Sequence, residues 1–270
     1  MVALSLDPVR TPAFDTIAVR RIGSEDINAA LRDALDDFRS KRGDLIFAGL
    51  IYPFVGLAAA WLALGNDILP LLFPVAAGIS LLGPLAATGF YELARRREAG
   101  LEAGWRHFFD IAKNPARDSI AVVGTILIAL FGAWLVAAVL IYTAFMGTAD
   151  PASPGAFLSA LFGTANGWAM MIVGNLVGLG FAILAFAISA ISLPMLVDRD
   201  VGAGPAMRAS IEAVRRNPMV MTRWGLTIAV LLVVGSLPFF LGLAVVLPVL
   251  GYATWHLYTR VVDREALAAV

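Results

Sequence analysis

The sequence predicts an all-α polytopic membrane protein with six transmembrane helices, arranged as three hairpins that each follow a cytoplasmic amphipathic helix. Two observations predict this fold: a series of long apolar segments, and the placement of every basic residue on one side of them. The apolar segments cover residues 44–64, 69–91, 119–146, 169–197, 222–240 and 242–259. A bilayer core about 30 Å thick needs about 20 apolar residues per helix, so each segment can cross it.

The composition agrees with a membrane protein. Hydrophobic residues make up 60% of the chain and its mean hydropathy is +0.82. Charged residues make up 15%, where soluble domains carry about 25%. The net charge is zero, so no overall field favours a nucleic acid, and the expected surroundings are the lipid bilayer. The chain has no Cys, which excludes disulfides, a thiolate nucleophile and a Cys-ligated metal.

The basic residues predict the orientation. All 20 Lys and Arg residues lie on one side of the spans: before the first span, between spans two and three, from the end of span four to Arg223 at the start of span five, or after span six. Cytoplasmic loops carry an excess of Lys and Arg, so both termini are expected in the cytoplasm, and the expected location is a bacterial inner membrane. The chain then divides into a cytoplasmic arm (1–43), a membrane domain (44–262) and a cytoplasmic tail (263–270).

Three amphipathic segments precede the three pairs of spans and suggest an internal repeat. They cover residues 24–39, 101–113 and 205–216, and the last two end in Asn114-Pro115 and Asn217-Pro218. Proline cannot continue a helix and pushes its predecessor out of the α region, so both helices should stop there.

The apolar stripes of these segments must be covered. At α-helical spacing the first stripe contains Ile27, Ala30, Leu31, Ala34, Leu35 and Phe38, and the second contains Trp105, Phe108, Phe109 and Ala112. We expect the three helices to pack against one another as a cap under the bundle rather than to lie in the lipid. The basic second and third helices would then neutralise Asp33, Asp36 and Asp37 of the first.

Two carboxylates end predicted spans. Glu92 ends span two beside Arg95, and Asp198 ends span four beside Arg199. We interpret them as interfacial carboxylates paired with those arginines. A proton or cation entry site is the alternative.

Two further groups are candidates for function or packing. In span four, Gly174 and Gly178 flank Asn175 in a small-xxx-small pattern, where another helix could approach and bond the amide. A substrate-binding amide is the alternative. In span six, Tyr252, His256 and Arg260 share one face at four-residue spacing, which could line a pocket or meet the lipid headgroups.

No stretch of the sequence matches a catalytic or cofactor motif. We find no P-loop, no His-Glu-x-x-His, no serine-nucleophile elbow and no zinc spacing. We therefore assign no catalytic residues, no cofactor and no metal ligands, and expect a protein that is not an enzyme.

Residues 247–258, with Tyr252-Ala253-Thr254-Trp255-His256 at their centre, resemble an uncharacterised family of six-span integral membrane proteins from proteobacteria. Residues 44–56 and the Asn217-Pro218 boundary are similar too, and the likeness extends over about 19–262. Some members carry the label "putative cytochrome c oxidase subunit I". That label does not fit a catalytic subunit, because haem and copper need about six histidines, and only His256 lies on a predicted span. A departure from the family is Tyr252, where a second histidine is expected.

Two functions follow as expectations. The first is a non-enzymatic accessory or scaffold subunit of another membrane protein complex, such as a respiratory one. The second is a small transporter or lipid-handling protein, which the repeat and the prolines within spans would suit. A polar cavity near Asn175 would favour the second function, and a packed bundle with a small-residue outer face the first.

Overall fold

The computed structural model describes residues 17–50, 74–75, 78, 80–148, 153–238 and 240–265. These residues form α-helices and 3₁₀ helices, with one isolated β-bridge between Val19 and Val262, so the all-α class is confirmed for them. The predicted first span beyond Leu50 and the start of the second lie outside the described residues.

The described elements follow one another along the chain in this order. They are α1 (Ser24–Gly49), η2 (Ser80–Leu82), α4 (Gly83–Ala86), α5 (Thr88–Glu98), η3 (Trp105–Lys113), α6 (Arg117–Met146), α7 (Pro154–Gly163), α8 (Ala165–Ser189), α9 (Ser192–Asp198), α10 (Ala203–Arg216), α11 (Pro218–Ser236) and α12 (Leu243–Val261).

Three stretches in the described part of the chain are long and apolar enough to cross a membrane. They are Arg117–Met146 (α6), Ala165–Asp198 (α8 with α9) and Pro218–Ser236 (α11), and they match the predicted third, fourth and fifth spans. Between 22% and 33% of their most apolar windows is buried inside the protein, so most of each surface is left for lipid. The predicted sixth span is the helix α12, which falls outside this group because its second half is polar.

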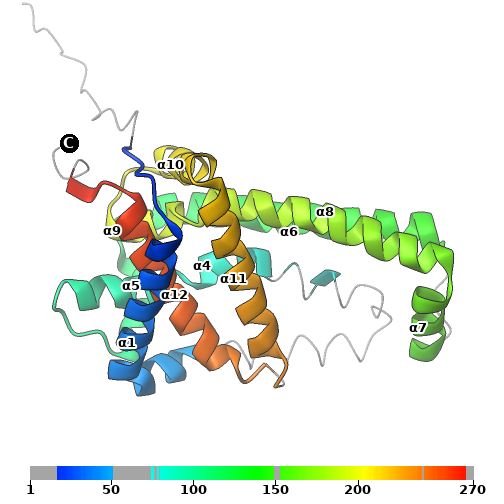
Figure 1. Ribbon diagram of the computed structural model, residues 1–270, viewed down its shortest axis with the longest axis horizontal. Helices are drawn as coiled ribbons and strands as arrows, with labels where there is room; N and C mark the ends of the chain where they lie inside the picture. Colours follow the sequence, from blue (N-terminus) through cyan, green and yellow to red (C-terminus); the bar gives the residue numbers. More distant parts are fainter. Residues whose placement is uncertain are drawn as a thin grey trace, which may run out of the picture.

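The helices form two groups that run in different directions (Figure 1). Helices α6 and α8 lie side by side along the long axis, with α7 at their far end, while α11 and α12 run across that axis. Helix α11 contacts α12, and α1 packs along α12. The pairs α6–α8 and α11–α12 agree with the second and third predicted hairpins, whereas the complete six-span arrangement stays a prediction.

Helix α1 differs from the prediction because it does not stop at residue 39. It continues without a break to Gly49, through the start of the predicted first span. No proline interrupts this stretch. The second and third amphipathic segments, by contrast, end at Lys113 and Arg216, as their Asn-Pro pairs predict.

The two asparagines of the Asn-Pro pairs join distant parts of the chain. The Nδ2 of Asn114 donates to the carbonyl oxygen of Val197 at 3.0 Å. The Oδ1 of Asn217 accepts from the backbone N–H of Ile22 at 2.9 Å, and its Nδ2 donates to the carbonyl oxygen of Arg20 at 3.1 Å. Each helix break is thereby fixed to a segment about 80 or 200 residues away in the sequence.

The second amphipathic segment is a 3₁₀ helix, and this changes which residues it buries. A 3₁₀ helix has three residues per turn, so positions i and i+3 share a face. Trp105, Phe108 and Ile111 are accordingly partly buried, while Phe109 is 54% exposed and Ala112 is exposed. The predicted stripe assumed α-helical spacing and was wrong at Phe109 and Ala112.

The cap is also assembled differently from the prediction. In α1, Ile27, Ala30 and Ala34 are buried as expected, but α12 is the helix that covers most of this stripe. Helix α1 does contact η3, whereas α10 packs mainly against α8 and α9. The buried parts of the stripes are therefore covered chiefly by α12, α5, α8 and α9, and not by one another.

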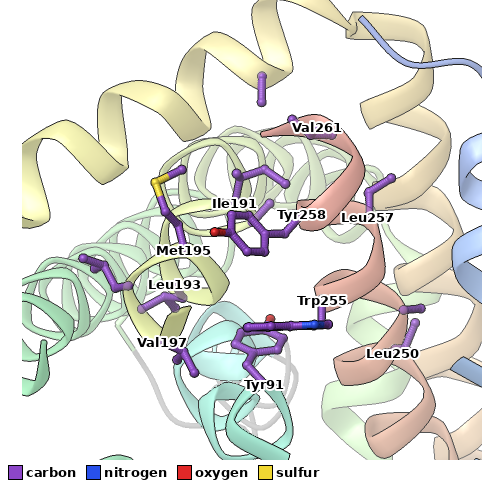
Figure 2. Packing of buried hydrophobic residues seen from close by; sticks show 14 of the residues in the cluster. Tyr91, Ile191, Leu193, Met195, Val197, Leu250, Trp255, Leu257, Tyr258 and Val261 are labelled. Atoms are coloured by element: carbon purple, nitrogen blue, oxygen red, sulfur yellow. The ribbon is translucent and has the colours of Figure 1, made fainter. Parts of the chain in front are cut away.

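The core lies where α5, α9 and α12 meet (Figure 2). Trp255 and Tyr258 of α12 are fully buried, with ring centroids 5.6 Å apart, and face Tyr91 of α5 and Met195 of α9.

Two glycines allow the aromatic rings of α5 and η3 to approach their neighbours. The ring of Phe90 lies 5.0 Å from that of Phe108, edge to face. A Cβ on Gly251 of α12 would lie 2.5 Å from the Cβ of Phe90, and a Cβ on Gly89 would lie 2.5 Å from the ring of Phe108. Any larger residue at Gly251 would force the helices apart.

We expect Phe108 and Phe109 to respond differently to truncation. Phe108→Ala should destabilise the protein by about 2–4 kcal/mol, because it opens a cavity beneath Phe90. Phe109→Ala, which alters an exposed ring next to it, should change stability by about 0.5 kcal/mol or less. Thermal unfolding of the two variants in the same detergent measures the difference. Equal melting temperatures for both variants would contradict the assignment of η3 as a 3₁₀ helix packed through Phe108.

Candidate functional site at the charged end

The charged side chains of α1, α5 and α12 meet around an open depression of about 500 Å³. We call the part of the molecule around this depression the charged end. The depression is lined by Asp33, Asp37, Ala94, Arg97, Glu98, His256, Thr259 and Arg260. These residues come from three helices that are far apart in the sequence.

Two aspartates of α1 pair with an arginine and a histidine of α12. Arg260 Nη2 donates to Asp33 Oδ2 at 2.6 Å, and His256 Nε2 lies 2.8 Å from Asp37 Oδ2. Residues four apart share a helix face, so the spacing of Asp33 and Asp37 matches that of His256 and Arg260. Arg97 of α5 adds a third contact, from Nε to Asp37 Oδ1 at 2.7 Å.

The predicted face of α12 therefore meets another helix. His256 and Arg260 face α1, and Tyr252, one turn earlier, is 2% exposed and belongs to the core. The expectation that the second and third amphipathic helices neutralise the aspartates of α1 was wrong. Asp33 and Asp37 find their partners on α5 and α12, and Asp36 pairs with Arg39 on its own helix.

A second group of charges joins α5 and α9 to the segment after α12. Asp198 accepts from Arg264 Nε at 2.9 Å and from the Tyr258 hydroxyl at 2.8 Å, while Arg199, its predicted partner, is 4.0 Å away. Arg264 also pairs with Glu98, which accepts from the indole N–H of Trp255 at 2.8 Å. Burial lowers the pKa of Arg264, but the bonds to Glu98 and Asp198 outweigh it, so the net pKa is raised and the guanidinium stays charged.

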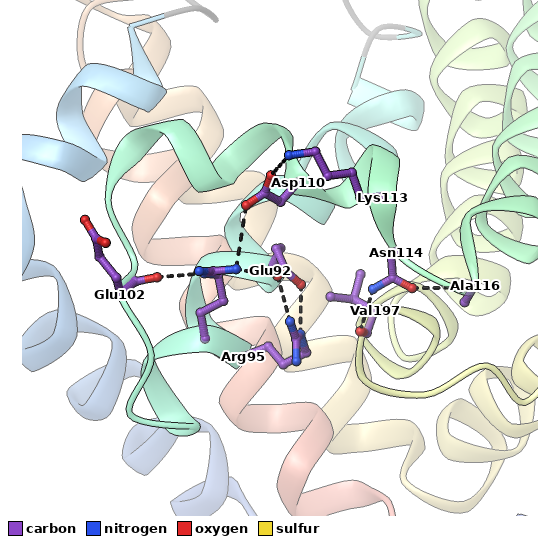
Figure 3. Close-up of polar contacts among 9 residues, drawn as sticks. Glu92, Arg95, Glu102, Asp110, Lys113, Asn114, Ala116 and Val197 are labelled. Atoms are coloured by element: carbon purple, nitrogen blue, oxygen red, sulfur yellow. Dashed lines mark hydrogen bonds and ion pairs between the residues drawn. The ribbon is translucent and has the colours of Figure 1, made fainter.

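Glu92 is the most deeply buried carboxylate of the charged end, at 3% exposure. Arg95 donates to both of its oxygens, at 2.8 and 2.7 Å, as the sequence predicted (Figure 3). Arg96 lies 3.9 Å from Glu92 and 3.6 Å from Asp110 of η3. The hydrogen bond from Lys113 lowers the pKa of Asp110, so this carboxylate stays ionised beside Arg96.

Asn175 lies apart from the charged end, on the exposed side of α8. Its Nδ2 donates to the carbonyl oxygen of Met171 at 2.8 Å, one turn earlier on the same helix, so the predicted bond across a helix contact is not formed by this N–H. The neighbouring glycines differ in role. A Cβ at Gly178 would lie 3.1 Å from the ring of Trp134 on α6, whereas a Cβ at Gly174 would meet no atom within 4 Å. The small-residue packing is thus present at Gly178 alone of the pair.

The ion pairs of the charged end hold several segments of the chain together. They connect α1 to α12 and to α5, and connect α5 and α9 to the segment after α12. Within the described residues, no three His, Asp or Glu side chains are placed to hold a metal ion. Sequence reasoning missed Arg97, Glu98 and Arg264 as members, and it assigned Asp33 and Asp37 to the wrong partner helices. The matching four-residue spacings on α1 and α12 were the available signal for Asp37, but helix partners cannot be read from spacing alone.

The spans and the comparisons together define the class of this protein. Three helices in the part of the chain that the structure describes are able to cross a bilayer, so it is a multi-pass integral membrane protein. Residues 72–198 match the model of the DUF2189 family, whose description is "predicted integral membrane protein". The match does not include residues 247–258, 44–56 or 217–218, on which the resemblance seen in the sequence rests. No curated protein and no solved structure gives a significant match.

The neighbouring residues Asp36 and Asp37 of α1 offer a matched test of these ion pairs. Asp37→Ala removes a carboxylate that is 18% exposed and leaves Arg97 and His256 without it, so stability should fall by about 1–3 kcal/mol. Asp36→Ala removes a carboxylate that is 73% exposed and should cost about 0–1 kcal/mol. Thermal unfolding in detergent at low and high salt measures both variants. A loss for Asp36→Ala as large as for Asp37→Ala would show that the α1–α12 pairs do not hold these helices together.

Proposed function

We propose that this protein is a non-enzymatic accessory or scaffold subunit of a membrane protein complex. The observation that carries the proposal is how the described residues use their charged and polar groups. Carboxylates of α1, α5 and α9 bind arginines or a histidine from other segments of the same chain, and so hold helices together. Charged groups used in this way hold the fold of the chain together. We therefore expect the protein to act through contacts of its outer surface with another protein.

An exposed small-residue face on α6 supports the proposal. Ala121, Thr125, Ala129 and Ala133 recur every four residues and are all exposed, and Gly132 lies beside them. Small residues at this spacing allow a second membrane helix to approach closely. This face is where we place the contact with another protein.

The second function, a small transporter or lipid-handling protein, has one observation in its favour. The open depression between α1, α5 and α12 is lined by charged groups that could meet a polar ligand. Asn175, the amide expected in a transport cavity, lies instead on the exposed side of α8. The accessory role is therefore the better supported of the two.

We also propose that the whole chain belongs to the matched family and lies in a bacterial inner membrane with both termini in the cytoplasm. The match to residues 72–198 supports the first statement, and the distribution of Lys and Arg supports the second.

Reporter fusions test this orientation. Alkaline phosphatase fused after residues 42, 117 or 223 should be inactive, because these positions are expected on the cytoplasmic side. A fusion after Gly147, at the far end of α6, should be active and serves as the control. Activity at any of the three basic positions would contradict the proposed orientation.

Isolation from native membranes tests the accessory role. The tagged chain, purified in a mild detergent, should carry a reproducible membrane partner in fixed proportion. Ala129→Leu with Gly132→Leu fills the small-residue face and should abolish recovery of that partner. Val230→Leu, at an exposed position of α11 that is already bulky, is the matched control and should retain it.

The result that contradicts the proposal is equally concrete. Recovery of the chain alone from native membranes, together with uptake or binding of a polar solute by liposomes that contain it, would favour the transporter. Recovery of the partner by the filled-face variant would show that α6 is not its contact.

A further inference from the structure

Helix α10 joins two of the candidate spans. The span Ala165–Asp198 ends shortly before α10 begins at Ala203, and the span Pro218–Ser236 begins directly after Asn217. The 14 residues of α10 are too few to cross a bilayer core, which needs about 20. Both spans therefore reach α10 at the same membrane surface, which places this helix at the level of the lipid headgroups.

The two sides of α10 differ in character. The helix packs mainly against α8 and α9. Four of its small residues are buried: Ala206, Ala209, Ser210 and Ala213. The outer side is exposed and carries Arg208, Ile211 and Arg215, at spacings of three and four residues that place them on one helix face. Helix α10 therefore presents two cations and one apolar side chain on its outer side.

The two cations of this outer side have no anion. The guanidinium groups of Arg208 and Arg215 form no hydrogen bond or ion pair with any other residue of the described ranges. Glu212, the acidic residue of α10, is already paired with Arg216 at 2.6 Å. With three arginines and one glutamate, α10 carries a net charge of +2. Charge complementarity therefore favours an anionic occupant.

The apolar neighbours indicate that this anion belongs to a lipid. Ile211 is 38% exposed, and Met219, at the start of α11, is 82% exposed. A small soluble anion leaves such side chains in water, whereas acyl chains cover them. Arg223 is also exposed, although it lies on the span α11 itself. An arginine so placed reaches back along its apolar stem to the phosphates, so the phosphate level is close to the point where α10 meets α11.

We propose that the outer side of α10 binds the phosphate groups of anionic membrane lipids through Arg208 and Arg215. The acyl chains of these lipids cover Ile211 and Met219, and the arginine stems lie along that apolar surface. The proposal goes beyond the accessory role and does not depend on it, because neither the small-residue face of α6 nor a partner protein takes part in it.

The undescribed residues 1–16 are the competing occupant within the chain. They precede Val19, whose carbonyl oxygen accepts from Arg216 Nη1 at 3.1 Å, so this segment joins the described chain near α10. It contains two aspartates but also Arg10, a net charge of −1. The segment cannot neutralise two arginines, whereas an anionic leaflet supplies a phosphate for each.

Lipid binding is measured on the full chain in a neutral detergent, by native mass spectrometry during titration with phosphatidylglycerol. Arg208→Gln with Arg215→Gln should raise the dissociation constant about ten- to thirtyfold, because each cation near an anionic surface contributes about a factor of five. Arg208→Lys with Arg215→Lys keeps both charges and should bind nearly as the parent does. The melting temperature in lipid-free detergent should be the same for all three proteins, because the two arginines bond to no described residue.

The matched control removes the same net charge elsewhere. Arg32→Gln with Arg39→Gln neutralises two exposed arginines of α1 and should bind phosphatidylglycerol nearly as the parent does. An equal loss of affinity in this control would show a general attraction by net charge, and would overturn the site on α10. Unchanged affinity in the Arg208→Gln, Arg215→Gln variant would overturn it as well, even where that variant loses an acidic protein partner.

Three further measurements identify the source of the phosphate. Phosphatidylcholine with the same acyl chains should bind several-fold more weakly, and glycerol phosphate should not displace phosphatidylglycerol. Displacement by an equal concentration of glycerol phosphate would show a site for soluble phosphates and contradict the proposal. The last measurement uses Asp7→Asn with Asp15→Asn. If this variant binds phosphatidylglycerol and the parent does not, the N-terminal segment occupies the arginines, and lipid is not their partner.

Discussion

The contact of α1 with α12 is the interaction on which the rest of the charged end depends. Helix α12 carries an apolar half and then a polar end with His256 and Arg260, which neither lipid nor a dry core accepts without partners. Helix α1 supplies Ile27, Ala30 and Ala34 against the apolar part, and Asp33 and Asp37 against Arg260 and His256. With α12 fixed in this way, α5 and α9 pack against its buried Trp255 and Tyr258. The tail after α12 then reaches Asp198 and Glu98 through Arg264.

The charged groups and the apolar faces divide the molecule into two parts with different tasks. At the charged end, the residues that could carry chemistry serve to join helices. Away from it, α6 and α8 extend as a pair with most of their apolar surface outward, as a helix in lipid requires (Figure 1). The feature of these two helices that lipid does not require is the small-residue face of α6. It suits a contact between membrane helices, which is why surface and assembly carry the functional argument.

The helix ends show how local sequence and distant contacts cooperate. The Asn-Pro pairs stop η3 and α10 for a local reason, because proline cannot continue a helix. Yet Asn114 and Asn217 also use their amides to bind the backbone of Val197, Ile22 and Arg20. The same residues thus end one element and fix its place in the fold, a second role that spacing does not reveal.

The sequence by itself determined the class of protein, the position of three spans, the two Asn-Pro helix ends and the pairing of Glu92 with Arg95. Each of these depends on hydropathy or on neighbours within one or two turns, and such information is local. The tertiary structure alone decided that α1 continues to Gly49, that η3 is a 3₁₀ helix with Phe109 outward, and that Asp198 binds Arg264. It also decided that Asp33 and Asp37 meet α12 and that Asn175 faces outward. These outcomes depend on which helix lies against which, and packing between distant segments has no signature in the spacing of one of them.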